Sequence, residues 1–244
     1  MAEEAPGIYA GQLAVEKPRP FLIDLAIRLV KEKPLGTVGA LIVLILLIVG
    51  IFATWIAPYG YEDGFTATGA SRLAPMSWDY WLGADQLGRD VLSRIIWGAQ
   101  ISLFVGLGVS TLSTVISGFI GIISGYLGGK ADLIIQRFVD AWMCFPGIFI
   151  MITLMALVGP GIPQVICVLG ILYGITGSRT VRGAAIGIKS NVYLEAARAI
   201  GAPTRTILWK HVLPNIMAPL IIVFTSRMGA AILAEASISF LGYG

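Results

Sequence analysis

The sequence has little charge for its length. Only 13% of its 244 residues are Asp, Glu, Lys or Arg, whereas 57% are apolar. A soluble domain typically carries about 25% charged residues. A soluble fold of this size could not bury so much apolar surface, so the deficit predicts a chain that lies in a lipid bilayer. The net charge of +3 is too small to indicate nucleic-acid binding.

Cysteine and histidine are also scarce. Cys144 and Cys167 both lie in long apolar stretches, and His211 is the only histidine. This count excludes a disulfide framework and argues against a Cys/His metal site, so we expect no bound metal. We interpret both cysteines as small buried apolar side chains.

The motifs of catalysis are missing as well. The apolar stretches hold no Ser/His/Asp set, no H-E-x-x-H motif and no carboxylate pair. The nearest approach to a P-loop ends in Gly128-Gly129-Lys130-Ala131, but Ser124 replaces its first glycine and Ala131 its last hydroxyl residue. We interpret this segment as a turn, and we expect a chain without a catalytic site or a cofactor of its own.

Long stretches without charge dominate what is present. A membrane-spanning helix needs about 20 mostly apolar residues. Such stretches predict an all-α integral membrane protein with a transmembrane domain over residues 35–244 and five spans, at about 35–57, 98–125, 138–158, 163–180 and 215–238. A turn at Gly159–Pro163 separates the third span from the fourth. The pairs Gly121/Gly125 and Gly170/Gly174 have the four-residue spacing that permits close helix packing.

The basic residues predict the orientation. Thirteen of the Lys and Arg residues fall in the segment before the first span and in the loops after the second and fourth spans, against three on the other side. Such residues are enriched in cytoplasmic loops, so the N-terminus is expected in the cytoplasm of a prokaryotic inner membrane. Residues 1–34 then form a cytoplasmic segment, in which apolar residues at helical spacing suggest a short interfacial helix or else a disordered tail: Leu22, Leu25, Ala26 and Leu29.

The loop at about 181–214 is the most informative segment. Asn191 can cap a helix over Val192–Ile200, and Gly201 ends it. Pro203 suits the first turn of a second helix, which would run to His211. Two short helices at the membrane surface could form a lever that docks to a soluble partner through a small face, or could be a packed connector without a partner. The residues of that face are Ala196, Ala197 and Ala199.

This loop resembles the "EAA" loop of ABC importer permeases. The pattern is EAA, three residues, Gly, nine residues and then I-x-L-P. Here it is met by Glu195-Ala196-Ala197, Gly201 and His211-Val212-Leu213-Pro214, with His211 as the one departure.

Further segments are similar to the OppC/DppC branch of this family, which serves peptide and nickel importers. They are Gly83–Asp90, Gly125–Gly129, Asp140 with Phe145-Pro146, and Glu235–Gly242. The resemblance covers about residues 20–244. It implies a type I importer bundle with a sixth span, and because the chain ends directly after an apolar run, we expect it to be a truncated form.

The resemblance also implies partners and a mechanism. Two permeases would form the pore, two ATPase subunits would bind Mg-ATP beneath them, and an extracytoplasmic binding protein would deliver a peptide or a related small solute. Glu195, Ala196, Ala197 and Gly201 would lie at the ATPase interface. Rigid-body motion of the loop would then rock the spans between two states.

Two charges fall inside the last span. Arg227 and Glu235 lie eight residues apart, about 12 Å along a helix, so we expect no direct pair. Each could line or gate the pore, or could bond to a neighbouring helix.

The segment 85–94 also leaves two interpretations. Its Asp85/Arg89 and Asp90/Arg94 spacings fit an exposed helix with ion pairs, or else a surface that receives the binding protein.

Two other functions remain open on the residues alone. An ion-coupled secondary transporter would want several intramembrane carboxylates and often an internal repeat, and here only Glu235 qualifies. A membrane scaffold that transports nothing would not need the spacing of the loop at 181–214.

Overall fold

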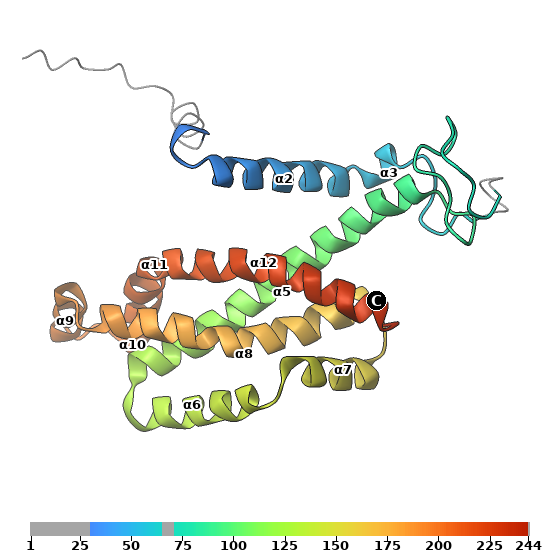
Figure 1. Cartoon of the computed structure of the whole chain (residues 1–244). Helices are drawn as coiled ribbons and strands as arrows, with labels where there is room; N and C mark the ends of the chain where they lie inside the picture. Colours follow the sequence, from blue (N-terminus) through green and yellow to red (C-terminus); the bar gives the residue numbers. More distant parts are fainter. Residues whose placement is uncertain (1–29, 65–70, 244) are drawn as a thin grey trace, which may run out of the picture. The chain divides into compact units, whose positions relative to one another are not determined.

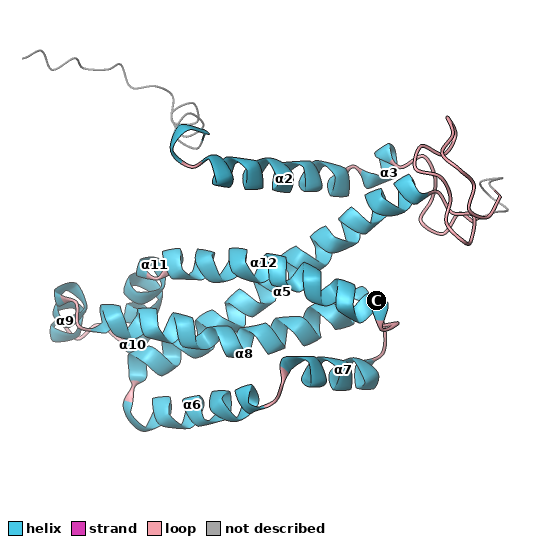
Figure 2. Ribbon diagram, in the orientation of Figure 1, coloured by secondary structure: helices cyan, strands magenta, loops and turns pink. Residues whose placement is uncertain are grey.

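The computed structural model describes residues 30–64 and 71–243, and in these segments the regular secondary structure is helical (Figures 1 and 2). The chain divides into two units, residues 1–46 and 47–244. The proposed interfacial helix at residues 22–29 lies outside the described residues.

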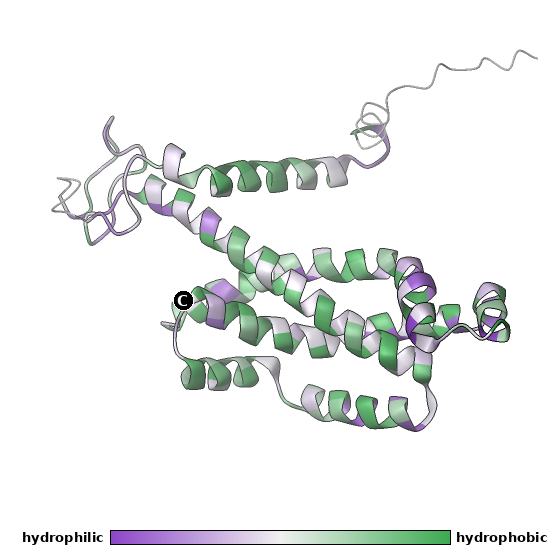
Figure 3. Cartoon of the chain, turned by 180° about the vertical axis from the view of Figure 1, so that it is seen from behind, coloured by the Kyte–Doolittle hydropathy of each residue, from purple (hydrophilic) through white to green (hydrophobic). Residues whose placement is uncertain are grey.

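The first described helix, α2, covers Pro34–Ile51, and the short α3 covers Ala53–Ile56. Pro34 occupies the first position of α2, where a residue without an N–H is tolerated because that group has no partner within the helix. Figure 3 shows α2 as almost uniformly hydrophobic. The segment predicted as a span at 35–57 is therefore helical over most of its length, with one interruption at Phe52.

Helix α5 is the longest element and covers Val91–Leu127. Asp90 caps it, because its carboxylate accepts hydrogen bonds from the N–H of Ser93 (2.8 Å) and from its hydroxyl (2.7 Å). At 1.5 Å per residue the helix is about 55 Å long, against about 30 Å for the hydrocarbon core of a bilayer. The predicted span at 98–125 is therefore the middle of a longer helix.

Helix α8, Ile162–Lys189, packs parallel to α5 along a seam of small residues. A Cβ added at Gly121 of α5 would lie 2.6 Å from the carbonyl oxygen of Ser178, and one at Gly174 of α8 would lie 2.6 Å from Cβ of Ile116. Gly125 and Gly170 show the same close approach. The predicted role of the glycine pairs is confirmed, since the two backbones could not come so close with larger side chains.

The predicted span at 138–158 is wrong as a continuous helix. Helix α6, Gly129–Cys144, and helix α7, Gly147–Val158, meet at an 85° bend. Pro146 has no N–H to donate and restricts Phe145 to an extended conformation, so the helix breaks there. Within residues 30–64 and 71–243, four helices are long and apolar enough to cross a membrane, or up to five if this bent pair counts as one span.

The last long helix, α12, covers Met217–Phe240 and lies along α5 and α8 (Figure 1). One core joins α5, α7, α8 and α12. Its most buried side chains include Val105, Val109, Met155, Val165, Leu169 and Ala231.

The segment before α5 differs from the predicted helix in two respects. Residues 85–89 form a turn and not a helix, although Asp85 and Arg89 do form an ion pair of 2.9 Å. Asp90 and Arg94 do not pair, because Asp90 serves as the cap of α5 and the guanidinium of Arg94 lies over the ring of Tyr61 at 5.1 Å.

The prediction that both cysteines are buried is wrong. Cys144 and Cys167 are free but exposed, not buried. The outer surface of a membrane bundle is itself apolar, so an apolar environment in the sequence does not imply burial among protein side chains.

Candidate functional site

The loop between α8 and α12 is built from short helical elements. These are α9 (Val192–Ala199), α10 (Thr204–Ile207), the π-helix η1 (Leu208–Val212) and α11 (Leu213–Asn215). The predicted start at residue 181 is too early, because α8 continues to Lys189. Figure 3 shows hydrophilic residues gathered around these elements.

The start of α9 differs from the prediction in its chemistry. Asn191 occupies the N-cap position, but its side chain makes no capping hydrogen bond. Its backbone carbonyl instead accepts from the N–H groups of Leu194 (2.9 Å) and Glu195 (3.3 Å). Glu195 still lies in the first turn, where the helix dipole favours a carboxylate.

The end of α9 is fixed by Gly201, as predicted. Gly201 has a φ of +76°, a left-handed conformation that favours glycine. Its N–H donates to the carbonyl of Arg198 (2.9 Å), and the N–H of Ala202 donates to that of Ala197 (3.1 Å). These two bonds form a Schellman motif, which satisfies the last carbonyls and turns the chain sharply toward α10.

One face of α9 packs inward. Leu194 is fully buried and Ala197 is 5% exposed. They share an apolar cluster with Tyr126 of α5, Ile207 of α10 and Val212 of η1. The three alanines of the predicted small face therefore do not point the same way, because Ala197 belongs to the interior of the loop.

The other face of α9 is open. Val192 is 79% exposed, and Glu195, Ala196 and Ala199 follow it at helical spacing, all exposed. Among the described residues the carboxylate of Glu195 has no hydrogen-bond or ion-pair partner. Apolar and small side chains held outward on a rigid helix, beside an unpaired carboxylate, are typical of a surface that meets another protein.

The two charges of α12 lie apart. Arg227 is half-buried, and its guanidinium lies 5.1 Å from the ring centroid of Tyr173 on α8. Glu235 is half-buried as well and accepts a hydrogen bond of 2.6 Å from the hydroxyl of Ser239. No ion pair joins Arg227 to Glu235 within the described chain, which agrees with the prediction from their spacing. A cation over an aromatic ring is a favourable arrangement for an arginine on a membrane helix.

A second set of charges was missed from the sequence. Arg182 of α8 forms a two-pronged ion pair with Asp132 of α6, at 2.6 and 2.5 Å. Ser124 of α5 donates to the same carboxylate and accepts from Gln136 at 2.9 Å. Arg179 of α8 pairs with Asp140 of α6. Arginines that were assigned to a loop therefore lie within α8 and join it to α6.

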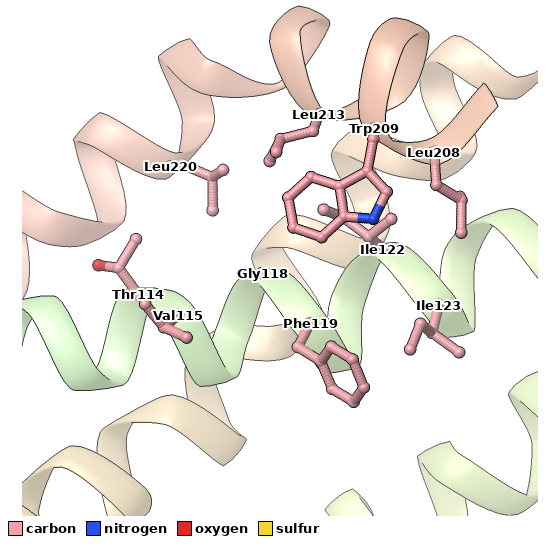
Figure 4. A pocket seen from close by; sticks show the side chains of 10 residues that line it. All are labelled: Thr114, Val115, Gly118, Phe119, Ile122, Ile123, Leu208, Trp209, Leu213 and Leu220. Carbon is pink, nitrogen blue, oxygen red and sulfur yellow. The ribbon is translucent and has the colours of Figure 1, made fainter. Parts of the chain in front are cut away.

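A groove lies between α5 and the segment from η1 to the start of α12. It has a volume of about 340 Å³ and is lined by apolar side chains apart from Thr114 (Figure 4). Trp209, Leu213 and Leu220 face Gly118 and Phe119 across it. Such a lining offers no charged group and only one hydroxyl to a polar solute.

No cluster of three or more potential metal-ligating side chains occurs in residues 30–64 and 71–243. Gly128 alone separates α5 from α6, which begins at Gly129, and both glycines have positive φ.

Comparison with known proteins decides the family. Residues 117–244 match the binding-protein-dependent transport system inner membrane component, and residues 22–75 match the N-terminal transmembrane domain of oligopeptide transport permease C. The glutathione transport system permease protein GsiD of Escherichia coli O6:K15:H31 is 39% identical over 214 residues, which are 88% of this chain and 70% of the relative. The protein of the same name from Shigella boydii serotype 4 gives the same values, and that from Shigella dysenteriae serotype 1 is 38% identical over the same shares.

The chain belongs to the binding-protein-dependent transport permeases of the OppC type. The permease is thus a multi-pass component of the inner membrane, as predicted. It is the transport subunit and not itself an ATPase, and the family implies ATPase and binding-protein partners. Membership also removes the alternatives of an ion-coupled transporter and a scaffold.

Proposed function

We propose that this permease forms one half of the pore of an ATP-driven importer for peptides or related small solutes. A second permease would complete the pore, an extracytoplasmic binding protein would deliver the solute, and two ATPase subunits would bind Mg-ATP beneath the bundle. The relatives that are glutathione permeases support a peptide-like cargo.

The orientation belongs to the same proposal. The distribution of Lys and Arg favours a cytoplasmic N-terminus, a transmembrane domain over 35–244 and a loop that projects from α8 into the cytoplasm. In the family a sixth span follows the last motif, so the complete bundle would have six.

The observation that carries the proposal is the two-sided construction of α9. Its inner face is buried against α5, α10 and η1, and the Schellman motif at Gly201 fixes its end. Its outer face, defined by Val192, Glu195, Ala196 and Ala199, has no partner among the described residues. An anchored helix with an open face can receive a displacement from a motor subunit and pass it to the bundle.

The possible pore residues are proposed more narrowly. Arg227 would act on the path through its position over Tyr173, and Glu235 through its bond with Ser239. A lone half-buried charge on a membrane helix is a functional candidate because its insertion is unfavourable by about 2.5–3.5 kcal/mol.

The test places a bulky side chain on the open face. Ala196→Phe should abolish ATP-driven uptake of glutathione into proteoliposomes, or release the ATPase subunits during purification, because the ring fills the space in which the partner would sit. Ala156→Phe, at an exposed alanine of α7, is the matched control and should retain uptake. Membrane yield and thermal midpoint should be the same in both variants.

Full ATP-driven uptake by Ala196→Phe with intact insertion would contradict the proposal. Copurification of the wild-type permease without any ATPase subunit, when expressed with its neighbouring genes, would contradict it more generally.

A further inference from the structure

Tyr126 is placed where three helices meet. It lies one residue before the end of α5 and is only 7% exposed. Its ring packs in the cluster that holds Leu194 and Ala197 of α9, with Ile188 of α8 against it. One residue earlier, a Cβ at Gly125 would lie 2.8 Å from the carbonyl oxygen of Arg182, so the backbone of α5 touches α8 here.

Arg198 makes three contacts from α9, two with Tyr126 and one with Lys189. Its guanidinium carbon lies 5.3 Å from the centroid of the Tyr126 ring, and its Nε donates to the Tyr126 hydroxyl at 3.3 Å. Its Nη2 donates to the backbone carbonyl of Lys189 at 3.2 Å. Lys189 is the last residue of α8, so one side chain of α9 contacts the ends of both α5 and α8. Figure 1 shows the ribbon of α9 beside the end of α8.

Lys189 closes the arrangement. Its ammonium lies 6.0 Å from the same ring centroid. A Cβ at Gly128, which directly follows α5, would be 3.1 Å from Nζ of Lys189. Tyr126 is thus approached by two cations, Arg198 from α9 and Lys189 from the end of α8.

The chemistry of the contact requires arginine. A planar guanidinium can lie near an aromatic face while its separate N–H groups donate to two different acceptors. A lysine ammonium is a compact point charge and could not hold the ring, the hydroxyl and the carbonyl in one geometry. Arg205, on the same loop, is exposed and contacts none of these groups, so a basic charge alone does not create the junction.

We propose that Arg198 is a positioning residue that makes α9 move as one body with the cytoplasmic ends of α5 and α8, through its contacts with Tyr126 and Lys189. This inference rests on the proposed function, because it specifies how displacement of α9 reaches the bundle. The apolar cluster beneath α9 opposes the separation of α9 from the bundle, but hydrophobic contacts do not fix an orientation. The three contacts of Arg198 do fix the angle of α9 relative to α5 and α8.

The experiment measures the distance between α9 and α5 in the complete complex. Spin labels are attached at Tyr193, on α9 but outside the four residues that define its outer face, and at Leu127, which are 39% and 50% exposed, after Cys144→Ala and Cys167→Ala. Pulsed electron paramagnetic resonance then gives the distance distribution without nucleotide and with Mg-ATP. In the wild type we expect a narrow distribution with the same mean in both states, because the two helices move together.

The variants separate the parts of the contact. Arg198→Gln should broaden the distribution by about twofold and shift its mean on addition of Mg-ATP, because α9 becomes a locally mobile unit. Tyr126→Phe retains the ring and should broaden it less, and Arg198→Lys should lie between these two. Lys130→Gln removes a nearby exposed charge without a partner in the described chain and should behave as the wild type.

Two results would overturn the inference. One is a distribution in Arg198→Gln as narrow as that of the wild type in both states. The other is a wild-type distance that itself changes on addition of Mg-ATP, since α9 would then move independently of α5. Retention of the ATPase subunits is measured in every sample. Their absence from the wild-type complex would refute the proposed function and not this inference. The widths of the distance distributions of the wild type and Arg198→Gln would then still be compared in the permease alone.

Discussion

The seam between α5 and α8 and the attachment of α9 are two different ways to hold helices together. At the seam, glycines bring the two helices into direct contact, because an added Cβ would lie 2.5–2.8 Å from the nearest atom of the other helix at Gly121, Gly125, Gly170 and Gly174. At α9, a few buried side chains and one arginine make the connection. The first leaves no room for adjustment, and the second depends on contacts that can be made and broken. A bundle that must transmit motion needs a rigid part and a part that receives force.

The largest effect is expected at the seam. Gly121→Val should prevent correct packing of α5 on α8, because even its Cβ would lie 2.6 Å from a backbone carbonyl and 2.7 Å from Cβ of Val181. Overpacking of a tight interface costs about 1–3 kcal/mol or more. We expect a strongly reduced yield of monodisperse protein in detergent and a lower thermal midpoint. Gly183→Ala has nothing within 4 Å of its added Cβ and serves as the control; an equal loss in both variants would refute the role of the seam.

A smaller loss is expected where α6 meets α8. Asp132→Asn should destabilise the bundle by about 1–3 kcal/mol, because Arg182 is left without its carboxylate partner in a partly buried place. Thermal unfolding of Asp132→Asn, Arg182→Gln and the double variant forms a double-mutant cycle. The double variant should lose less than the sum of the two single variants.

Strict additivity in that cycle would show that the pair is not coupled. Glu62→Gln, at an exposed carboxylate before α5, is the control and should change stability little.

At α9 the expected effect is local. Gly201→Ala forces an L-residue into the left-handed region at φ +76°, which costs about 1–2 kcal/mol. Hydrogen exchange of the amides in α9 should accelerate, whereas that of the amides in α5 and α8 should not change. Gly187→Ala, inside α8 and with open space around it, should be neutral or slightly stabilising. Equal exchange in α9 of both variants would contradict the assignment of Gly201 as its stop.

The smallest effect is expected at the turn before α5. Burial would raise the pKa of Asp85, but hydrogen bonds from the N–H groups of Arg89 and Leu87 and from the Arg89 guanidinium outweigh it and hold that pKa below its usual value. A lowered folded pKa gives stability that is present above the unfolded pKa of about 3.9 and is lost as the pH falls through the folded pKa.

Asp85→Asn should therefore lower the thermal midpoint at pH 6, and the difference from the wild type should shrink as the pH falls below about 3.9 and through the lower folded pKa of Asp85. The loss is expected to be under about 1 kcal/mol, because the pair is about one-quarter exposed. A difference that grows on acidification would contradict this sign.

The comparison also shows what a sequence can reveal. Local chemistry was sufficient for the stop at Gly201 and for the glycine seam, because both depend on the absence of a side chain at a known spacing. Helix α8 was predicted to end near residue 180, because Arg179 and Arg182 suggest a membrane boundary. Those arginines are paired with Asp140 and Asp132 of α6, about 40 to 50 positions away in the chain, so the helix can continue.

Two other errors have different origins. The apolar run continues across Phe145-Pro146 and therefore predicts a single span there, although proline forbids a regular helix at this point. Ala197 was placed on the partner face because the spacing of α9 does not say which side meets Tyr126. Packing across the bundle decides the position of Ala197, whereas the break at Pro146 follows from local backbone chemistry.

The central claim is that the open face of α9 meets the ATPase. A photo-crosslinking amino acid placed at Val192 or Ala196 in the assembled complex tests it most directly, with Trp78, 93% exposed in the segment before α5, as the control position. The account predicts crosslinks from α9 to an ATPase subunit and none from position 78. Crosslinks to the ATPase from position 78, or from neither position of α9, would contradict it.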